Sequence, residues 1–235
     1  DVKITNPEVI GKSVRDVFKG NNITGLVISR IMKNNEVSIA MADTILSEND
    51  IVTLVGTRES LRKNLSFFGV LSSTDLSVNR TKLDFRRIFV SNKKVIGKAI
   101  RDLDLQTEYH ATVTRLKRGD SDIVPTPDTI LQAGDRIRVI TDHDNMEKIT
   151  KFFGDSIHKL SEIDYISVSL GIILGLIIGI IPIPLPGGTS FKLGFAAGPL
   201  IVALILGRLE RTGNIVWGMS YNANLTLRQI GLVLF

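Results

Sequence analysis

The chain has 235 residues, with 29 Lys and Arg against 24 Asp and Glu, a formal net charge of +5 and no cysteine. The lack of cysteine excludes a disulfide framework, a Cys-ligated metal or iron–sulfur site and a thiol nucleophile. A basic chain first suggests nucleic acid or an anionic membrane as partner, but the mean hydropathy of +0.19 is high for a soluble protein with 23% charged residues. We therefore expect two different compositions in one chain.

The two compositions meet near residue 164. Charged residues are frequent and nearly balanced before that point, as in an ordinary soluble region. Residues 165–235 are strongly apolar, and their charged residues are Lys192, Arg208, Arg211, Arg228 and Glu210. We interpret this second part as a membrane region. The soluble part has too few clustered basic and aromatic residues for nucleic-acid binding, so none is expected. Because the chain begins without Met and ends within the apolar run GLVLF, we expect a fragment of a longer protein.

The soluble part contains an internal repeat with a period of about 85 residues. The matching pairs are VIGKSVRDV (Val9–Val17) with VIGKAIRDL (Val95–Leu103), Asp43–Leu46 with Asp128–Leu131, Arg30 with Arg115, and Asp50 with Asp135. Four landmarks in the same order predict two copies of one small domain, residues 1–68 and 86–153. Residues 69–85 would link the copies, and residues 154–164 would connect the second copy to the apolar region.

Each copy is predicted to be α+β. In the first copy, Ser13 can cap a short helix and Thr57 a second one that ends near Phe68. Runs rich in β-branched residues predict strands at 23–32, 36–40 and 50–55.

In the second copy we expect strands at 109–116 and 136–140. Asp142 would cap the last helix, with Met146 and Ile149 facing inward.

These repeats resemble the TrkA-C domain. The most specific segment is LQAGDRIRVI (Leu131–Ile140), and LSENDIVTLV (Leu46–Val55) is a weaker match because Asn49 stands where the family usually has Gly. The resemblance implies domains that pair and sense small ligands, and we expect the equivalent residues Arg30 and Arg115 to contact a regulatory ligand. No G-x-G-x-x-G occurs, so no NAD-type nucleotide is expected and no cofactor is predicted.

The apolar region begins with a predicted helix, Tyr165–Ile181, near the short end of the roughly 20 residues that span a bilayer. Gly171, Gly175 and Gly179 lie on one face of it, four residues apart. We expect this face to pack closely against another helix. A substrate path along it is the alternative.

A loop or a re-entrant break follows, because Pro182, Pro184 and Pro186 cannot continue a helix. The next apolar stretch, Leu193–Gly207, is again short and carries Gly194 and Gly198 for helix packing. Short segments interrupted by Pro and Gly can mark the binding site of a transporter. On this reading the candidate substrate-binding residues are Gly187, Gly188, Thr189 and Ser190. The alternative is a hairpin of two ordinary short spans.

Further polar residues precede a last helix, which we expect from Ala223. Asn222, Asn224 and Arg228 are candidates for binding an anionic substrate, because an arginine within a membrane segment is costly and usually functional. Arg228 could instead lie near the interface and reach water or lipid phosphate. Trp217 is predicted to be an aromatic residue at the membrane interface.

The distribution of basic residues predicts an orientation. If residues 1–164 are cytoplasmic, the second span returns so that Arg208 and Arg211 are also cytoplasmic, as the positive-inside rule favours. We therefore expect a multi-pass protein of the bacterial inner membrane.

The segments FKLGFAAGPLIVALILGRLERTGNIVW and NANLTLRQIGLVLF resemble the second membrane half of the aspartate–alanine exchanger family. In that family, tandem TrkA-C domains lie between two membrane halves, in the order seen here. The resemblance implies an exchanger of small carboxylates or amino acids. Its partners would be the lipid bilayer, a small anionic or zwitterionic substrate, a small regulatory ligand and a second copy of the chain.

Other functions receive less support from the sequence. TrkA-C domains alone would also fit a ligand-sensing component of a potassium channel or cation antiporter, although Pro182–Lys192 contains no TVGYG-like filter. The repeats could also serve only to hold a dimer together. No arrangement of catalytic residues is present, so no enzyme is predicted. His110, His143 and His158 share no ligand spacing, so no metal site is expected.

Overall fold

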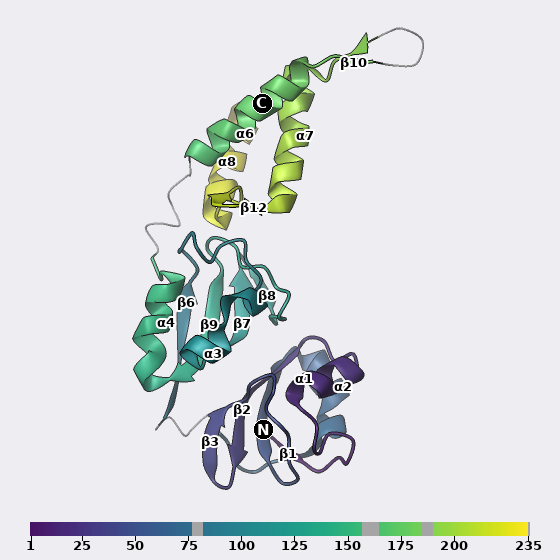
Figure 1. Ribbon diagram of the computed structural model, residues 1–235, viewed down its shortest axis with the longest axis vertical. Helices are drawn as coiled ribbons and strands as arrows, with labels where there is room; N and C mark the ends of the chain where they lie inside the picture. Colours follow the sequence, from purple (N-terminus) through teal and green to yellow (C-terminus); the bar gives the residue numbers. More distant parts are fainter. Residues whose placement is uncertain (77–81, 157–164, 185–189, 235) are drawn as a thin grey trace.

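The computed structural model describes residues 1–76, 82–156, 165–184 and 190–234. Figure 1 shows two units that each contain a sheet, followed along the chain by a group of helices. The two units are the two copies of the repeat, and the helices belong to the apolar region.

The first copy is an antiparallel sheet with strand order β3-β2-β4-β1-β5 and two helices. Its elements are β1 (Val2–Ile4), α1 (Val14–Gly20), β2 (Leu26–Lys33), β3 (Glu36–Ile39), β4 (Ile51–Gly56), α2 (Arg58–Phe68) and β5 (Gly69–Leu71). Both predicted caps are confirmed, because the side chains of Ser13 and Thr57 accept hydrogen bonds of 3.1 Å from the amides of Asp16 and Ser60.

The second copy has the strand order β6-β9-β7-β8, which is the order of β1-β4-β2-β3 in the first copy. Its elements are β6 (Leu83–Phe89), η1 (Ile100–Leu103), α3 (Leu105–Tyr109), β7 (Thr112–Arg118), β8 (Ser121–Ile123), β9 (Arg136–Asp142), η2 (His143–Asn145) and α4 (Met146–Phe153). The closing contacts also match, since Ile4 pairs with Gly69 and Val90 with Gly154. The predicted repeat is therefore confirmed as a repeat of the fold.

Some sequence expectations need correction. The first strand of each copy, β1 and β6, was not predicted, and β6 begins at Leu83. Asp142 precedes a 3-10 turn, and its side chain makes no capping hydrogen bond. Its carboxylate lies 3.5 Å from Nδ1 of His110 instead, so it joins α3 to the end of β9. Met146 and Ile149 are buried, as expected.

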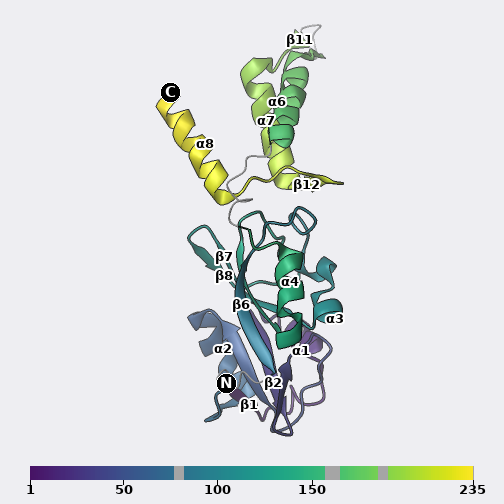
Figure 2. The ribbon, with the colours of Figure 1, turned by 90° about the vertical axis from the view of Figure 1, so that its left-hand side faces the viewer.

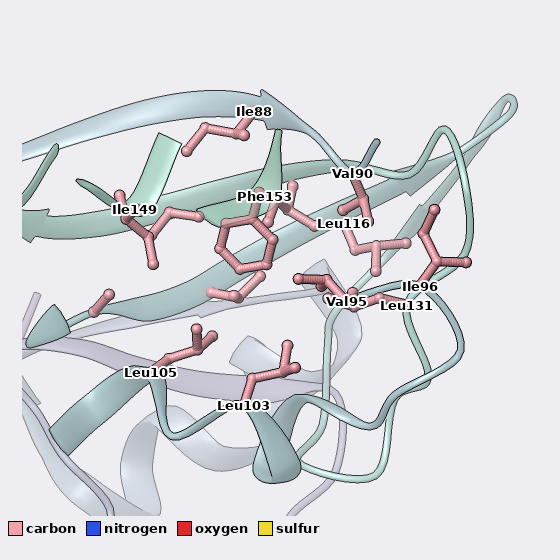
Figure 3. Close-up of a cluster of buried hydrophobic side chains, with 14 of the residues drawn as sticks. Ile88, Val90, Val95, Ile96, Leu103, Leu105, Leu116, Leu131, Ile149 and Phe153 are labelled. Atoms are coloured by element: carbon pink, nitrogen blue, oxygen red, sulfur yellow. The ribbon is translucent and has the colours of Figure 1, made fainter. Parts of the chain in front are cut away.

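Each copy has its own apolar core between its sheet and its helices. In the second copy, Phe153 from α4 lies among Ile88, Leu116 and Ile149 (Figure 3). In the first copy, Phe68 from α2 is completely buried in the same way. Burying a side chain of this size contributes roughly 1.5–3 kcal/mol to stability, so the helix that ends each copy holds its sheet in place.

The described residues of the apolar region form three helices and two small hairpins. The elements are α6 (Tyr165–Ile180), β10 (Ile183–Pro184), β11 (Ser190–Phe191), α7 (Gly194–Leu209), β12 (Arg211–Thr212), β13 (Ile215–Val216) and α8 (Tyr221–Leu234). Ser190 lies in β11, so it is not part of α7. α6 and α7 have 16 residues each, or roughly 24 Å against a hydrocarbon core of about 30 Å. Within the described ranges, every helix is either too short or too polar to traverse a bilayer by itself.

Glycines allow α6 and α7 to touch through their backbones. A Cβ atom added to Gly175 would lie 2.3 Å from Cα of Pro199, and one added to Gly198 would lie 2.3 Å from the carbonyl oxygen of Gly175. One added to Gly179 would lie 2.3 Å from the carbonyl oxygen of Gly194. At Gly171 the helices are further apart, with Leu206 as the nearest neighbour at 3.6 Å. The close approach therefore runs along Gly175 and Gly179 of α6 and Gly194 and Gly198 of α7.

Candidate functional site

The two regulatory candidates, Arg30 and Arg115, occupy equivalent places beside equivalent β-bulges. The register of β2 against β4 shifts between Ile28 and Arg30, and that of β7 against β9 shifts between Val113 and Arg115. A bulge re-aims the side chains that follow it. Both arginines therefore leave the core side of their sheets.

The bulges are stabilised by matching hydroxyl groups. The Ser29 hydroxyl donates to the carbonyl oxygen of Thr53, and the Thr114 hydroxyl donates to the carbonyl oxygen of Arg138, each at 3.3 Å. Ser29 and Thr114 are both buried. Because a buried hydroxyl needs a partner, each bond fixes the bulge beside it.

The two arginines differ in their surroundings. Arg30 is only 5% exposed, whereas Arg115 is exposed. Arg115 lies in register with Arg138 of β9, which in turn lies in register with Arg87 of β6. Burial lowers the pKa of Arg138, and the positive charges of Arg87, Arg115 and Arg30 lower it further. The structure therefore brings Arg30 and Arg115 into one basic cluster.

The cluster lies where the two copies meet. Ile39 of the first copy is buried with Leu83 and Ile140 of the second. Lys82 forms an ion pair with Glu36 of β3. Through this apolar patch and this exposed ion pair, the two sheets contact each other with the faces that point away from their helices. The contact lies near the arginines.

A second junction joins the second copy to the helices. Nη1 of Arg211 in β12 donates to the carbonyl oxygens of Lys93 and Ile96, at 2.7 Å each. Beside it, the Gln132 amide donates to the carboxylate of Glu210. The segment after α7 is thus held by two turns of the second copy.

The turn that carries Gln132 is itself fixed by a buried carboxylate. Asp135 is 1% exposed and accepts from the backbone amide of Gln132 at 2.8 Å and from Nη2 of Arg118 at 2.7 Å. The bonds to Asp135 raise the pKa of Arg118. In the first copy, Asp50 accepts from the amide of Ser47 in the same way, at 2.7 Å.

The β12–β13 hairpin also contributes to the core of the second copy. Val216 is 7% exposed and belongs to the same apolar cluster as Ile88 and Phe153. Trp217 donates from its indole nitrogen to the Thr212 hydroxyl at 2.9 Å and from its backbone amide to the carbonyl oxygen of Glu210 at 2.8 Å. Trp217 therefore closes the hairpin, a role that its prediction as an interface aromatic did not include.

A hollow of about 520 Å³ lies between the second copy and the helices. Its lining includes Ile96, Gly171, Leu206, Glu210, Trp217 and Asn224. Asn224 is the one predicted substrate residue that borders this hollow among the described side chains. Glu210 supplies the negative charge there, and its second carboxylate oxygen is buried without a hydrogen-bond partner in the described structure.

The predicted substrate residues do not form one site. Gly187, Gly188 and Thr189 lie outside the described residues. Asn222, Asn224 and Arg228 lie in α8, where Asn224 and Arg228 are exposed and one turn apart. β11, which contains Ser190, lies at the opposite end of α6 and α7 from β12 and the start of α8 (Figure 2). Within the described residues, no three His, Asp or Glu side chains group as a metal site.

Comparison with known families gives matches over nearly the whole chain. The TrkA-C domain model matches residues 1–69 and 85–154. A second model, described as a predicted permease membrane region of the Asp-Al exchanger type, matches residues 167–235.

Curated relatives are transporters. An uncharacterized transporter of Geobacter sulfurreducens is 50% identical over 210 residues, which are 89% of this chain and 38% of that protein. One of Bacteroides fragilis is 36% identical over 233 residues, 99% of this chain and 43% of that protein. The chain thus spans about two fifths of the length of these relatives. The RCK_C domain dimer of Streptococcus agalactiae BusR, solved with c-di-AMP, is 27% identical with a TM-score of 0.28, covering 29% of this chain and 93% of that one.

Proposed function

Because the chain belongs to the aspartate–alanine exchanger family of transporters with tandem TrkA-C domains, we propose that it is part of a secondary active exchanger. Its substrates would be small carboxylates or amino acids, with aspartate and alanine as the first candidates. The observation that carries the proposal is the direct succession, in one chain, of two TrkA-C copies and a permease region.

We propose that residues 165–235 contribute to a multi-pass membrane domain. The α6–α7 pair exposes large apolar side chains, such as Ile166 at 76% and Phe195 at 72%. Exposed apolar surface on this scale marks contact with lipid or with other protein segments. Neighbouring helices of the longer relatives would complete the bilayer crossing that α6 and α7 leave short.

The proposed orientation has residues 1–164 in the cytoplasm. The start of α6 and the end of α7 both lie toward the second copy (Figure 1), and Arg211 bonds to that copy. This arrangement supports a hairpin that leaves the cytoplasmic side and returns to it. It also agrees with the positive-inside rule, since Arg208 and Arg211 then share that side.

We propose that the TrkA-C copies regulate the exchanger by sensing a small ligand, or by pairing with a second copy of the chain. The β12–β13 hairpin is one contact through which such a signal would reach the helices. On this proposal Asn224 and Arg228 remain the candidates for the substrate among the described residues.

Exchange by the full-length protein in liposomes tests the proposal. Vesicles loaded with labelled aspartate should release it when alanine, aspartate or a related carboxylate is added outside, and should retain it in buffer alone. Failure to exchange any amino or dicarboxylic acid would reject the substrate class. A potassium flux under the same conditions would favour the regulatory component of a channel or cation antiporter instead.

A further inference from the structure

The outer face of the second sheet carries a row of three arginines. Arg87, Arg138 and Arg115 are direct partners across β6, β9 and β7. Like charges placed directly opposite one another destabilise a sheet. A guanidinium group cannot relieve the repulsion by losing its proton at ordinary pH. The row is therefore a concentrated positive charge that the register of the strands imposes.

Aromatic rings hold part of this face in position. The guanidinium of Arg138 lies 5.1 Å from the ring centroid of Phe85. In the next row, that of Arg136 lies 5.6 Å from the ring of Phe89. Such contacts restrict a long side chain, so Arg138 loses less conformational freedom when an anion binds it.

At the equivalent positions of the first copy, the row contains both a positive and a negative side chain. Asp1 stands where Arg87 does and Thr53 where Arg138 does, next to Arg30. The Asp1 carboxylate accepts from the Thr53 hydroxyl and, at 2.8 Å, from the amide of Leu76. The first copy thus carries its own carboxylate where the second copy carries arginine.

On the outer face of the second sheet, no described carboxylate is in register with the arginine row. Asp142, at the far end of β9, lies beside His110. Asp122 of β8 is in register with Lys117, not with the arginine row. Within the row, each arginine is paired across the strands only with another arginine among the described residues.

We propose that Arg87, Arg138 and Arg115 bind a small multivalent anion of the phosphoryl class at the junction of the two TrkA-C copies, with buried Arg30 adding its charge from the first copy. Strands about 4.8 Å apart make the row roughly 10 Å long. That length suits two phosphoryl groups better than one carboxylate. Guanidinium groups bind phosphate oxygens in a two-pronged geometry.

This inference names the class of ligand that the proposed sensing role would involve. Only the effect of the anion on transport rests on the proposed function. An anion bound to the row would cancel the repulsion around Arg138 and would be shared with the first copy through Arg30. Binding would therefore stabilise the junction between the copies, whatever substrate the membrane part carries.

Thermal unfolding of the purified full-length protein tests the site, with inorganic pyrophosphate as probe and sodium chloride adjusted to constant ionic strength. Saturating pyrophosphate should raise the unfolding midpoint of the second copy by at least about 2 °C. Arg138→Gln should abolish that rise. Without pyrophosphate, Arg138→Gln should unfold close to the unmodified protein, because the loss of the like-charge repulsion offsets the loss of the contact with Phe85. Arg62→Gln, on the exposed side of α2, is the matched control and should keep the full rise.

An equal rise in the Arg138→Gln variant, or no rise in the unmodified protein, would overturn the site. A rise with succinate as large as that with pyrophosphate would overturn the phosphoryl class. Exchange in liposomes without pyrophosphate is a separate measurement. Intact exchange with no anion binding would reject this inference and leave the proposed transport function standing.

Discussion

Nη1 of Arg211 donates to the carbonyl oxygen of Ile96 at 2.7 Å, and this bond crosses from the β12–β13 hairpin to a turn of the second TrkA-C copy. The same nitrogen also donates to the carbonyl oxygen of Lys93. Carbonyl groups in a turn often lack strand partners, so a charged donor satisfies them well. Arg211 is therefore one of the side chains that hold this junction together.

Replacing Arg211 with Ala should therefore weaken the junction. Hydrogen bonds to a charged group contribute roughly 1.5–3 kcal/mol, and a loss of this order should appear as a lower unfolding midpoint of the second copy. Hydrogen exchange should accelerate in residues 93–97. Arg208→Ala is the control, because Arg208 is exposed one turn earlier. Equal exchange rates in the two variants would contradict the assigned role of Arg211.

A substitution at Gly97 tests the same contact from the second copy. The equivalent glycine of the first copy, Gly11, provides the control. Gly97 has φ +76 and Gly11, its equivalent in the first copy, has φ +80. A Cβ on Gly97 would lie 2.8 Å from Cβ of Arg211, whereas one on Gly11 would have no neighbour within 4 Å. Both alanine variants should lose about 1 kcal/mol to backbone strain.

Gly97→Ala should lose more than Gly11→Ala, because only Gly97 must also displace the hairpin. Chemical unfolding of the two variants gives the difference directly. If the two substitutions cost the same, the hairpin does not press on Gly97 in solution.

Gly175→Ala should separate α6 from α7. Its Cβ would lie 2.3 Å from Cα of Pro199, a backbone atom that cannot move aside alone. Gly207→Ala, in the same helix pair, meets nothing within 4 Å and should raise stability by roughly 0.5–1 kcal/mol through helix propensity. Unfolding of the full-length protein in detergent should move in opposite directions for the two variants. A shift in the same direction would argue against the close approach.

The ion pair between Glu36 and Lys82 predicts a pH effect at the contact between the copies. The hydrogen bond and charge of Lys82 lower the pKa of Glu36 below its ordinary value. A carboxyl with a lowered pKa stabilises the fold above its unfolded pKa, and this contribution disappears as the pH falls through the folded value. NMR titration should find the Glu36 pKa below the ordinary value of a glutamate, and Lys82→Gln should move it upward. An unchanged value in that variant would show that the pair does not persist in solution.

The sequence predicts features that depend on neighbouring residues better than those that depend on partners far along the chain. The Ser13 and Thr57 caps are local, since each side chain bonds to an amide three residues later. β6 was missed because arginines interrupt its apolar residues, and its pairing with β9 depends on residues far away in sequence. The row of Arg87, Arg138 and Arg115 required the register of three strands, which composition does not reveal.

The candidate site was predicted only in part for the same reason. Arg30 and Arg115 were recognised as equivalent from the repeat, but their shared neighbour Arg138 has no counterpart in the first copy, where Thr53 stands. The roles of Glu210 and Arg211 were also missed, because both appeared to be charges flanking a membrane segment. Their partners lie far back in the chain, since Gln132 precedes Glu210 by 78 residues and Ile96 precedes Arg211 by 115.

The burial of Val216 changes where the second TrkA-C copy should be considered complete. Composition places the change from polar to apolar sequence near residue 164, yet a side chain far beyond that point fills part of the core of this copy. A recombinant protein that stops at residue 164 would lack Val216 and uncover part of this core, and should be more prone to self-association than one that stops after the first copy. The folding unit and the compositional unit of this protein therefore end at different residues.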